Sequence, residues 1–197
     1  MTTYSLVRNA GPLWEAATRS AFLNALAAGS LAANSFRRWL AQDYLFAKDL
    51  MAFQAVLLTK TPRDCHKPLT GGLAALDNEM GWFESHAAGL QVDLDIPPHP
   101  TCRRYTDFLL RCVYTQPYPV LLAILFGVEA SYLAAWSALP LSGPYAEFIE
   151  RWSSADFATY VEALGGLAER HTHEAAQEHF NEVLGHEREF WKMSWEG

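Results

Sequence analysis

The stretch VLLAILFGVEASYLAAW, residues 120–136, is the most apolar part of the chain, yet it carries an acid at its centre. Its residues 120–128 are all apolar. This run is only nine residues long, whereas a helix that spans a bilayer needs about 20. We therefore expect a buried helix and no membrane association. One face of this helix, at spacings of three, seven and four residues, is formed by Leu122, Leu125, Tyr132 and Trp136. Glu129 lies on that same face.

Helical periodicity of this kind recurs along the whole chain, and Gly and Pro interrupt it. No pair of strands and no hairpin signal is evident. We predict helices over about 13–28, 34–59, 69–88, 101–114 and 120–139, shorter helical pieces within 145–170, and a last helix over about 173–195. This pattern predicts an all-α bundle of seven to eight helices that forms a single domain over residues 1–197.

Two further acids interrupt apolar helix faces. Asp43 lies in a stripe made of Trp39, Phe46, Leu50 and Phe53, and Glu187 lies in one made of Phe180, Leu184 and Trp191. Burial of an ionised carboxylate is costly unless it is paired or shifts its pKa. These stripes contain no Lys or Arg, so the partners could be metal ions, histidines or a ligand rich in N–H groups. Three such acids on three helices predict a functional pocket, to which Tyr105 would add a phenol.

The composition narrows the class of protein. The net charge of −7 and pI near 5.4 argue against nucleic-acid binding, which needs clustered basic residues. Three cysteines without CxxC spacing favour reduced thiols and a cytoplasmic location. The first eight residues lack the pattern of a signal peptide, so we expect none. Aromatic residues make up 13% of the chain and could form walls for a flat heteroaromatic ligand.

Two of the acids stand in motifs that resemble those of a known family. The segment QDYLF, residues 42–46, is preceded by Phe36 and Trp39, and the chain ends in EREFWKM, residues 187–193. Together with the order of the helices between them, these segments resemble the TenA family of thiaminase II and related aminopyrimidine hydrolases. The resemblance implies the haem-oxygenase-like helical bundle. It also implies a dimer or tetramer of identical subunits.

The resemblance assigns expected roles to the site residues. Asp43 would hold the amino group and a ring nitrogen of a pyrimidine, and Glu187 would act as acid or base on the ring. The pocket walls would be Phe46, Tyr105, Tyr132 and Trp152. The reaction needs no cofactor and no metal.

One departure separates this chain from many members of that family. Those members carry a catalytic cysteine on the fifth helix, where this chain has Val128, with Glu129 beside it. The segment resembles the cysteine-free branch, which is associated with aminomethyl- or formylaminomethyl-pyrimidines from damaged thiamin. We therefore expect Glu129 to replace the thiol, and we do not expect cleavage of intact thiamin through a covalent thioether.

Two alternatives remain open from the residues. A haem-oxygenase-like di-iron or dimanganese oxidase would use ligands drawn from Glu79, His86, Glu129, His179, Glu182 and His186, although Val183 stands where a further carboxylate would be expected. The chain could also be a non-catalytic pyrimidine-binding protein. Haem oxygenase itself is excluded because it uses a histidine on the first helix, and this chain has none before His66.

Overall fold

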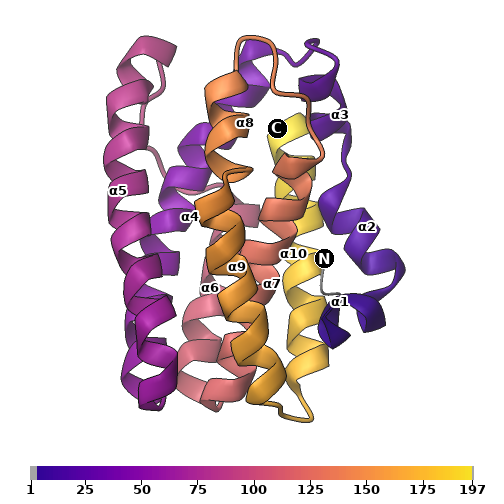
Figure 1. Ribbon diagram of the computed structural model, residues 1–197. Coiled ribbons are helices and arrows are strands. Elements are labelled where there is room, and N and C mark those ends of the chain that lie inside the picture. The colour runs from indigo at the N-terminus through magenta and orange to yellow at the C-terminus, as the bar shows by residue number, and fades with distance from the viewer. Residues whose placement is uncertain (1–3, 197) are drawn as a thin grey trace.

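Helix α7 (Tyr118–Ser137) forms the centre of the computed structural model, which describes residues 4–196. The other long helices pack around it (Figure 1). Within the described chain, α7 is the one helix long and apolar enough to cross a membrane, so the nine-residue run understated its apolar length. However, 78% of its most apolar window is buried inside the protein. This burial, rather than its length, identifies α7 as a core helix.

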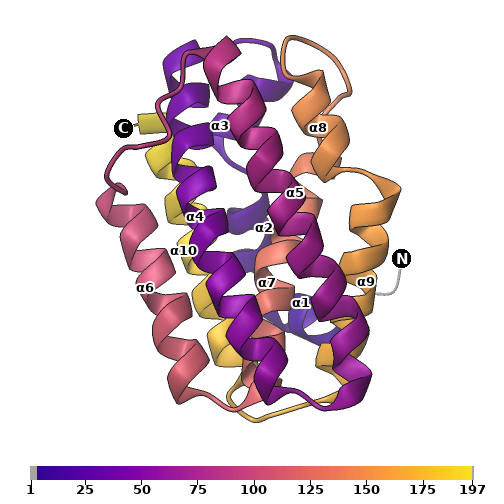
Figure 2. The same ribbon diagram turned by 90° about the vertical axis from the view of Figure 1, so that its left-hand side faces the viewer.

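The long helices lie side by side along the long axis of the molecule, as the two views show (Figures 1 and 2). They are α4 (Ala33–Lys60), α5 (His66–Leu90), α6 (Pro100–Thr115), α9 (Ala155–Arg170) and α10 (Ala176–Glu196). Helix α4 packs against α5 on one side and α6 on the other, and α10 packs against α7. The all-α class predicted from the periodicity is confirmed.

The N-terminal region differs from the single predicted helix over residues 13–28. It contains α1 (Ser5–Ala10), α2 (Pro12–Thr18) and α3 (Ala21–Ala27). Gly11 has a φ of 53°, which glycine adopts without steric cost, and it separates α1 from α2. The Ser20 hydroxyl accepts a hydrogen bond from the Leu23 amide at 3.1 Å and so caps α3. The apolar period continues across this cap, which is why periodicity alone predicted one helix.

With α8 (Ala146–Trp152) and a short 3₁₀ helix η1 (Arg63–Cys65), residues 4–196 contain ten α-helices and one 3₁₀ helix. The expectation of no signal peptide concerns the first eight residues, of which 1–3 lie outside the described range. Helix α9 starts separately from α8 because the Ser154 side chain accepts a hydrogen bond from the Phe157 amide. The break between these helices places Trp152 at the C-terminal end of α8, facing the core.

Three tryptophans anchor the core on the side where α8 packs. The Trp39 ring lies 5.2 Å from that of Trp136 and 5.4 Å from that of Trp152, and the last two are 5.0 Å apart. All three are almost fully buried. Burial of each large side chain stabilises the fold by roughly 1.5–3 kcal/mol. This cluster holds Trp152 in a fixed position, and Trp152 also forms part of the pocket described next.

Candidate active site

A single pocket lies between the long helices and contains all seven predicted site residues. The empty space between its lining atoms is about 520 Å³, which includes space open to solvent. Its polar lining consists of Asp43, Glu79, Tyr105, Glu129, Tyr132 and Glu187. Its apolar lining consists of Phe46, Ala47, Leu50, Leu76, Val128, Trp152, Phe157 and Phe190. The helices that supply these side chains are distant in sequence, so the pocket exists only in the folded chain.

Asp43 reaches the pocket from α4 and is 6% exposed. Its Oδ2 accepts a hydrogen bond of 2.7 Å from the Tyr132 hydroxyl of α7. Burial raises the pKa of Asp43 well above its usual range, and the nearby acids Glu79 and Glu187 raise it further. The hydrogen bond from Tyr132 opposes this rise because it stabilises the ionised form. The result is a carboxyl group that is held in place and binds its proton more tightly than an exposed aspartate does.

Glu187 is the corresponding acid of α10, and it is paired in the same way. The Tyr105 hydroxyl of α6 donates a hydrogen bond of 2.6 Å to Glu187 Oε1. Burial raises the pKa of Glu187 to about 7, and the hydrogen bond from Tyr105 limits the rise. A group with this pKa can both give and take a proton at neutral pH.

The Glu129 side chain has no hydrogen bond to any of the residues that the structure describes, although the residue is only 8% exposed. Burial raises its pKa to about 8, with further contributions from the charges of Glu79, Glu187 and Asp43. Val128 lines the pocket beside it, whereas none of the three cysteines belongs to the lining. Glu129 is therefore a free, proton-retaining carboxyl group that faces the pocket.

Glu79 of α5 is a fourth pocket acid, although the sequence indicated it only as a candidate metal ligand. Its Oε1 accepts a hydrogen bond of 3.3 Å from the Trp152 indole N–H. Burial raises the pKa of Glu79 to about 7, and the charge of Arg151 partly opposes that rise. The sequence does indicate a buried position for this acid, since Glu79 follows Leu76 by three residues and precedes Phe83 by four. This spacing puts it on a buried helix face, as for Asp43.

The four predicted aromatic walls also lie around the pocket. The Phe46 and Tyr105 rings are 4.7 Å apart, and the Tyr132 and Trp152 rings meet edge to face at 5.7 Å. These rings leave the carboxyl groups as the main hydrogen-bonding groups inside an apolar enclosure. A flat ligand with N–H donors and basic ring nitrogens would match this combination of walls and acids.

Of the residues of the metal-oxidase alternative, Glu79 and Glu129 line the pocket, but the three histidines and Glu182 do not. His86 Nε2 lies 3.3 Å from Glu147, and its Nδ1 lies 2.8 Å from the Trp82 carbonyl oxygen. His179 bonds to the backbone of its own helix, and His186 stacks on Tyr105. Glu182 is exposed. Within residues 4–196, ligand atoms of three His, Cys, Asp or Glu residues converge at Asp64, Cys65 and His171, and none of these three residues lines the pocket. The geometry therefore does not support a di-metal centre in this pocket.

The fold and the site together define an α-helical protein with an acid-lined, aromatic-walled pocket for a small molecule. The TENA/THI-4/PQQC family model matches residues 7–197, and the chain belongs to this family. The sequence is 29% identical over 201 residues to the "Probable bifunctional TENA-E protein" of Glycine max, covering 92% of this chain and 88% of that protein.

Solved structures of the family have the same fold. A TenA homologue from Pyrococcus furiosus matches with a TM-score of 0.89 and 29% identity, over 96% of this chain and 98% of that one. A TenA-like thiaminase from Sulfolobus solfataricus matches with a TM-score of 0.83 at 19% identity, over 96% and 93%. A TenA family transcription regulator from Silicibacter sp. TM1040 matches at 0.90 and 22% identity, over 98% and 95%. The haem-oxygenase-like bundle predicted from the resemblance is confirmed.

Proposed function

We propose that this protein is a hydrolase of thiamin salvage that acts on aminomethyl- or formylaminomethyl-4-aminopyrimidines. The pocket carries this proposal, because burial raises the pKa of its four carboxyl groups and aromatic side chains form its walls. No Lys or Arg is among the lining residues. A substrate that brings its own N–H groups and basic nitrogens would supply the missing partners. The thiaminase-like and TENA-E relatives support a thiamin-related hydrolase.

In this proposal Asp43 recognises the aminopyrimidine edge. A neutral carboxyl group has one donor and one acceptor oxygen, and a 4-aminopyrimidine presents an acceptor nitrogen next to an N–H donor. The raised pKa of Asp43 supports the neutral form. Tyr132 fixes the Oδ2 atom, so both hydrogen bonds to the pyrimidine would have a defined direction.

Glu187 and Glu129 would share the proton transfers. Glu187 exchanges a proton with a ring nitrogen, which makes the exocyclic carbon more electrophilic. The ionised form of Glu129 takes a proton from the attacking water and then gives it to the leaving amine. A C–O bond forms, the C–N bond breaks, and the products from an aminomethyl substrate are the hydroxymethyl-pyrimidine and ammonia. The pKa values of about 7 and about 8 suit these roles because they lie near the working pH.

Val128 argues against the thiaminase reaction. A covalent thioether needs a thiol at the pocket, and Val128 occupies the lining beside Glu129. The described cysteines are buried elsewhere, in η1 and α6. We therefore propose that intact thiamin is not cleaved. We also propose that the enzyme works as a cytoplasmic homo-oligomer, without nucleic-acid or membrane partners.

A substrate panel tests this function. Thiamin, aminomethyl-4-aminopyrimidine and its formylated form are incubated with the purified full chain, and ammonia, formate and released thiazole are measured. We expect ammonia or formate from at least one pyrimidine and no thiazole from thiamin. The variant Glu189→Gln is a matched control, because Glu189 is on the same helix as Glu187 and pairs with Arg188 on the surface. No turnover with tight binding of hydroxymethyl-pyrimidine would instead indicate a non-catalytic binding protein.

A further inference from the structure

A second cluster of reactive side chains lies at the end of the bundle where α4 leads into α5 and α9 leads into α10 (Figure 1). Asp64 and Cys65 belong to η1, and His171 is the residue that follows α9. Asp43 is 17 residues before Lys60, the last residue of α4, which corresponds to about 26 Å of helix. The cluster is therefore separate from the pocket.

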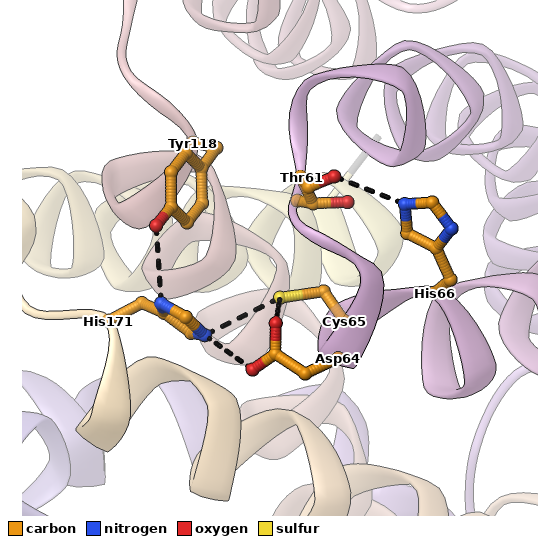
Figure 3. Close-up of polar contacts among 6 residues, drawn as sticks. All are labelled: Thr61, Asp64, Cys65, His66, Tyr118 and His171. Carbon is orange, nitrogen blue, oxygen red and sulfur yellow. Dashed lines mark hydrogen bonds and ion pairs between the residues drawn. The ribbon is translucent and has the colours of Figure 1, made fainter.

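Three ligand-type atoms converge in this cluster, as Figure 3 shows. His171 Nε2 lies 3.0 Å from Asp64 Oδ2 and 3.6 Å from Cys65 Sγ. The three groups all present one such atom within 4.8 Å of the others. Tetrahedral coordination with Zn–S of about 2.3 Å and Zn–N of about 2.0 Å would place sulfur and nitrogen about 3.6 Å apart. The observed distance of 3.6 Å between Cys65 Sγ and His171 Nε2 therefore matches the edge of such a tetrahedron.

The arrangement differs from that of a cysteine nucleophile. In a catalytic triad the acid and the nucleophile contact different nitrogens of the histidine, because the acid orients the ring through one nitrogen while the other takes the proton of the nucleophile. Here Asp64 and Cys65 both face Nε2. Cys65 is also fully buried, whereas a catalytic cysteine is partly exposed. Convergence on one nitrogen is the geometry of shared coordination.

The other ring nitrogen of His171 has a partner of its own. Tyr118 Oη lies 3.2 Å from His171 Nδ1 (Figure 3). When Nδ1–H donates a hydrogen bond to the Tyr118 hydroxyl, the lone pair of Nε2 is left for a metal, which is the usual arrangement for a metal-binding histidine. The His66 ring points away from the cluster and bonds to the Thr61 carbonyl oxygen at 3.1 Å. Asp64 is half-exposed and provides a route to solvent.

We propose that Asp64, Cys65 and His171 form a binding site for a zinc-like divalent ion, with water at the fourth position. One thiolate, one imidazole and one carboxylate are the ligand types that favour Zn²⁺ over harder ions such as Mg²⁺ or Ca²⁺. The ion would tie the α4–α5 connection to the end of α9. The site is independent of the proposed hydrolase chemistry.

The probe for this site is Co²⁺, which binds zinc sites and shows a charge-transfer absorption when a thiolate coordinates it. The full chain is stripped with a chelator, dialysed and titrated with Co²⁺, and Zn²⁺ is then added as competitor. We expect one Co²⁺ per chain, a thiolate band that saturates at one equivalent, and loss of the band on addition of Zn²⁺.

Variants assign the ligands. Cys65→Ser should remove the thiolate band, and Asp64→Asn and His171→Gln should weaken binding at least tenfold. Tyr118→Phe should weaken it by roughly tenfold, as for other residues that orient a ligand. Cys112→Ser, which removes another buried thiol, and Glu187→Gln, which alters the pocket, should bind as the unmodified protein does.

Asp64→Asn is also expected to fold normally, because the half-exposed Asp64 side chain can be replaced without opening the core. Melting temperatures of the metal-free variants confirm that each one folds. The proposal is overturned if no thiolate band appears at one equivalent, if the band survives in Cys65→Ser, or if Asp64→Asn and His171→Gln bind as tightly as the unmodified chain.

Discussion

The pocket at mid-bundle and the cluster at the bundle end both gather polar side chains, but they gather different kinds. The pocket holds four carboxyl groups, two of them fixed by tyrosines, with aromatic walls around them. The bundle-end cluster combines a carboxylate, a thiol and an imidazole around one nitrogen atom. Oxygen acids in an apolar enclosure suit a nitrogen-rich organic ligand, whereas a mixed oxygen, nitrogen and sulfur set suits a transition-metal ion. The composition of each cluster therefore predicts its ligand.

The largest effect that separates the two regions is expected from Glu129→Gln. This change removes the free carboxyl group of the pocket and leaves its shape. We expect turnover of the aminopyrimidine to fall by about 100- to 10,000-fold, the range of general acid–base catalysis. Affinity for hydroxymethyl-pyrimidine should change little, and Co²⁺ binding should not change. Ammonia release and calorimetric titration measure the first two. Undiminished turnover would remove Glu129 from the mechanism.

A smaller effect is expected from Tyr105→Phe, which deletes the hydrogen bond to Glu187. That bond holds the pKa of Glu187 down, so its loss should move the pKa above about 7. We expect the corresponding limb of the kcat/KM profile to shift to higher pH, and activity at pH 7 to fall by roughly tenfold. A purely structural role for Tyr105 would lower activity equally at every pH.

The pocket acids should also make the ligand-free protein less stable as the pH rises. Their pKa values in the fold are above the ordinary value near 4.5, reaching about 7 for Glu79 and Glu187 and about 8 for Glu129. Between about pH 4.5 and pH 8 the unfolded chain has released protons that the folded chain still binds. The stability that depends on these acids is therefore highest below about pH 4.5 and falls as the pH rises to about 8. This refers to the contribution of these groups alone.

Glu129→Gln measures that contribution. At pH 8 it should raise the free energy of unfolding by about 1–3 kcal/mol, since one pKa unit corresponds to about 1.4 kcal/mol. At pH 5 it should have little effect, and Glu189→Gln should have little effect at either pH. Scanning calorimetry at both pH values gives the comparison. An equal effect of Glu129→Gln on the free energy of unfolding at pH 5 and at pH 8 would show that burial does not hold the carboxyl group neutral.

The smallest effect is expected from Trp152→Phe, which removes the indole N–H that bonds to Glu79 at 3.3 Å. The ring remains aromatic, so the wall is kept. We expect KM for the aminopyrimidine to rise about threefold, with kcat nearly unchanged, as measured by steady-state kinetics. A fall in kcat larger than the change in KM would place Glu79 in the chemistry rather than in the support of the wall.

The sequence was sufficient for the helix faces but not for the contacts between helices. Asp43, Glu129 and Glu187 could be placed on buried faces because the 3.6-residue period fixes which side of a helix each residue occupies. The same period covers Glu79, which was missed as a pocket acid because its spacing to His86 suggested a metal ligand. The N-terminal helices were merged because the apolar period continues through the cap at Ser20.

Contacts between distant segments had no signal in the sequence. Tyr132 meets Asp43 across 89 residues, and His171 meets Asp64 across 107. Such pairs depend on how α7 and α9 pack against the α4–α5 pair, which a single sequence does not encode locally. The adjacent Asp64 and Cys65 looked like loop residues until the fold brought His171 to them. Pairing of groups in three dimensions, rather than residue type, defines both regions.

The central claim is that the acid pocket recognises a 4-aminopyrimidine through Asp43. Calorimetric titration should compare 4-amino-hydroxymethyl-pyrimidine with the analogue in which hydrogen replaces the amino group. We predict at least tenfold tighter binding of the amino compound by the unmodified protein, and loss of this preference in Asp43→Leu, which removes both the donor and the acceptor of the side chain. Equal binding of the two compounds by the unmodified protein, or an unchanged preference in Asp43→Leu, would contradict the claim.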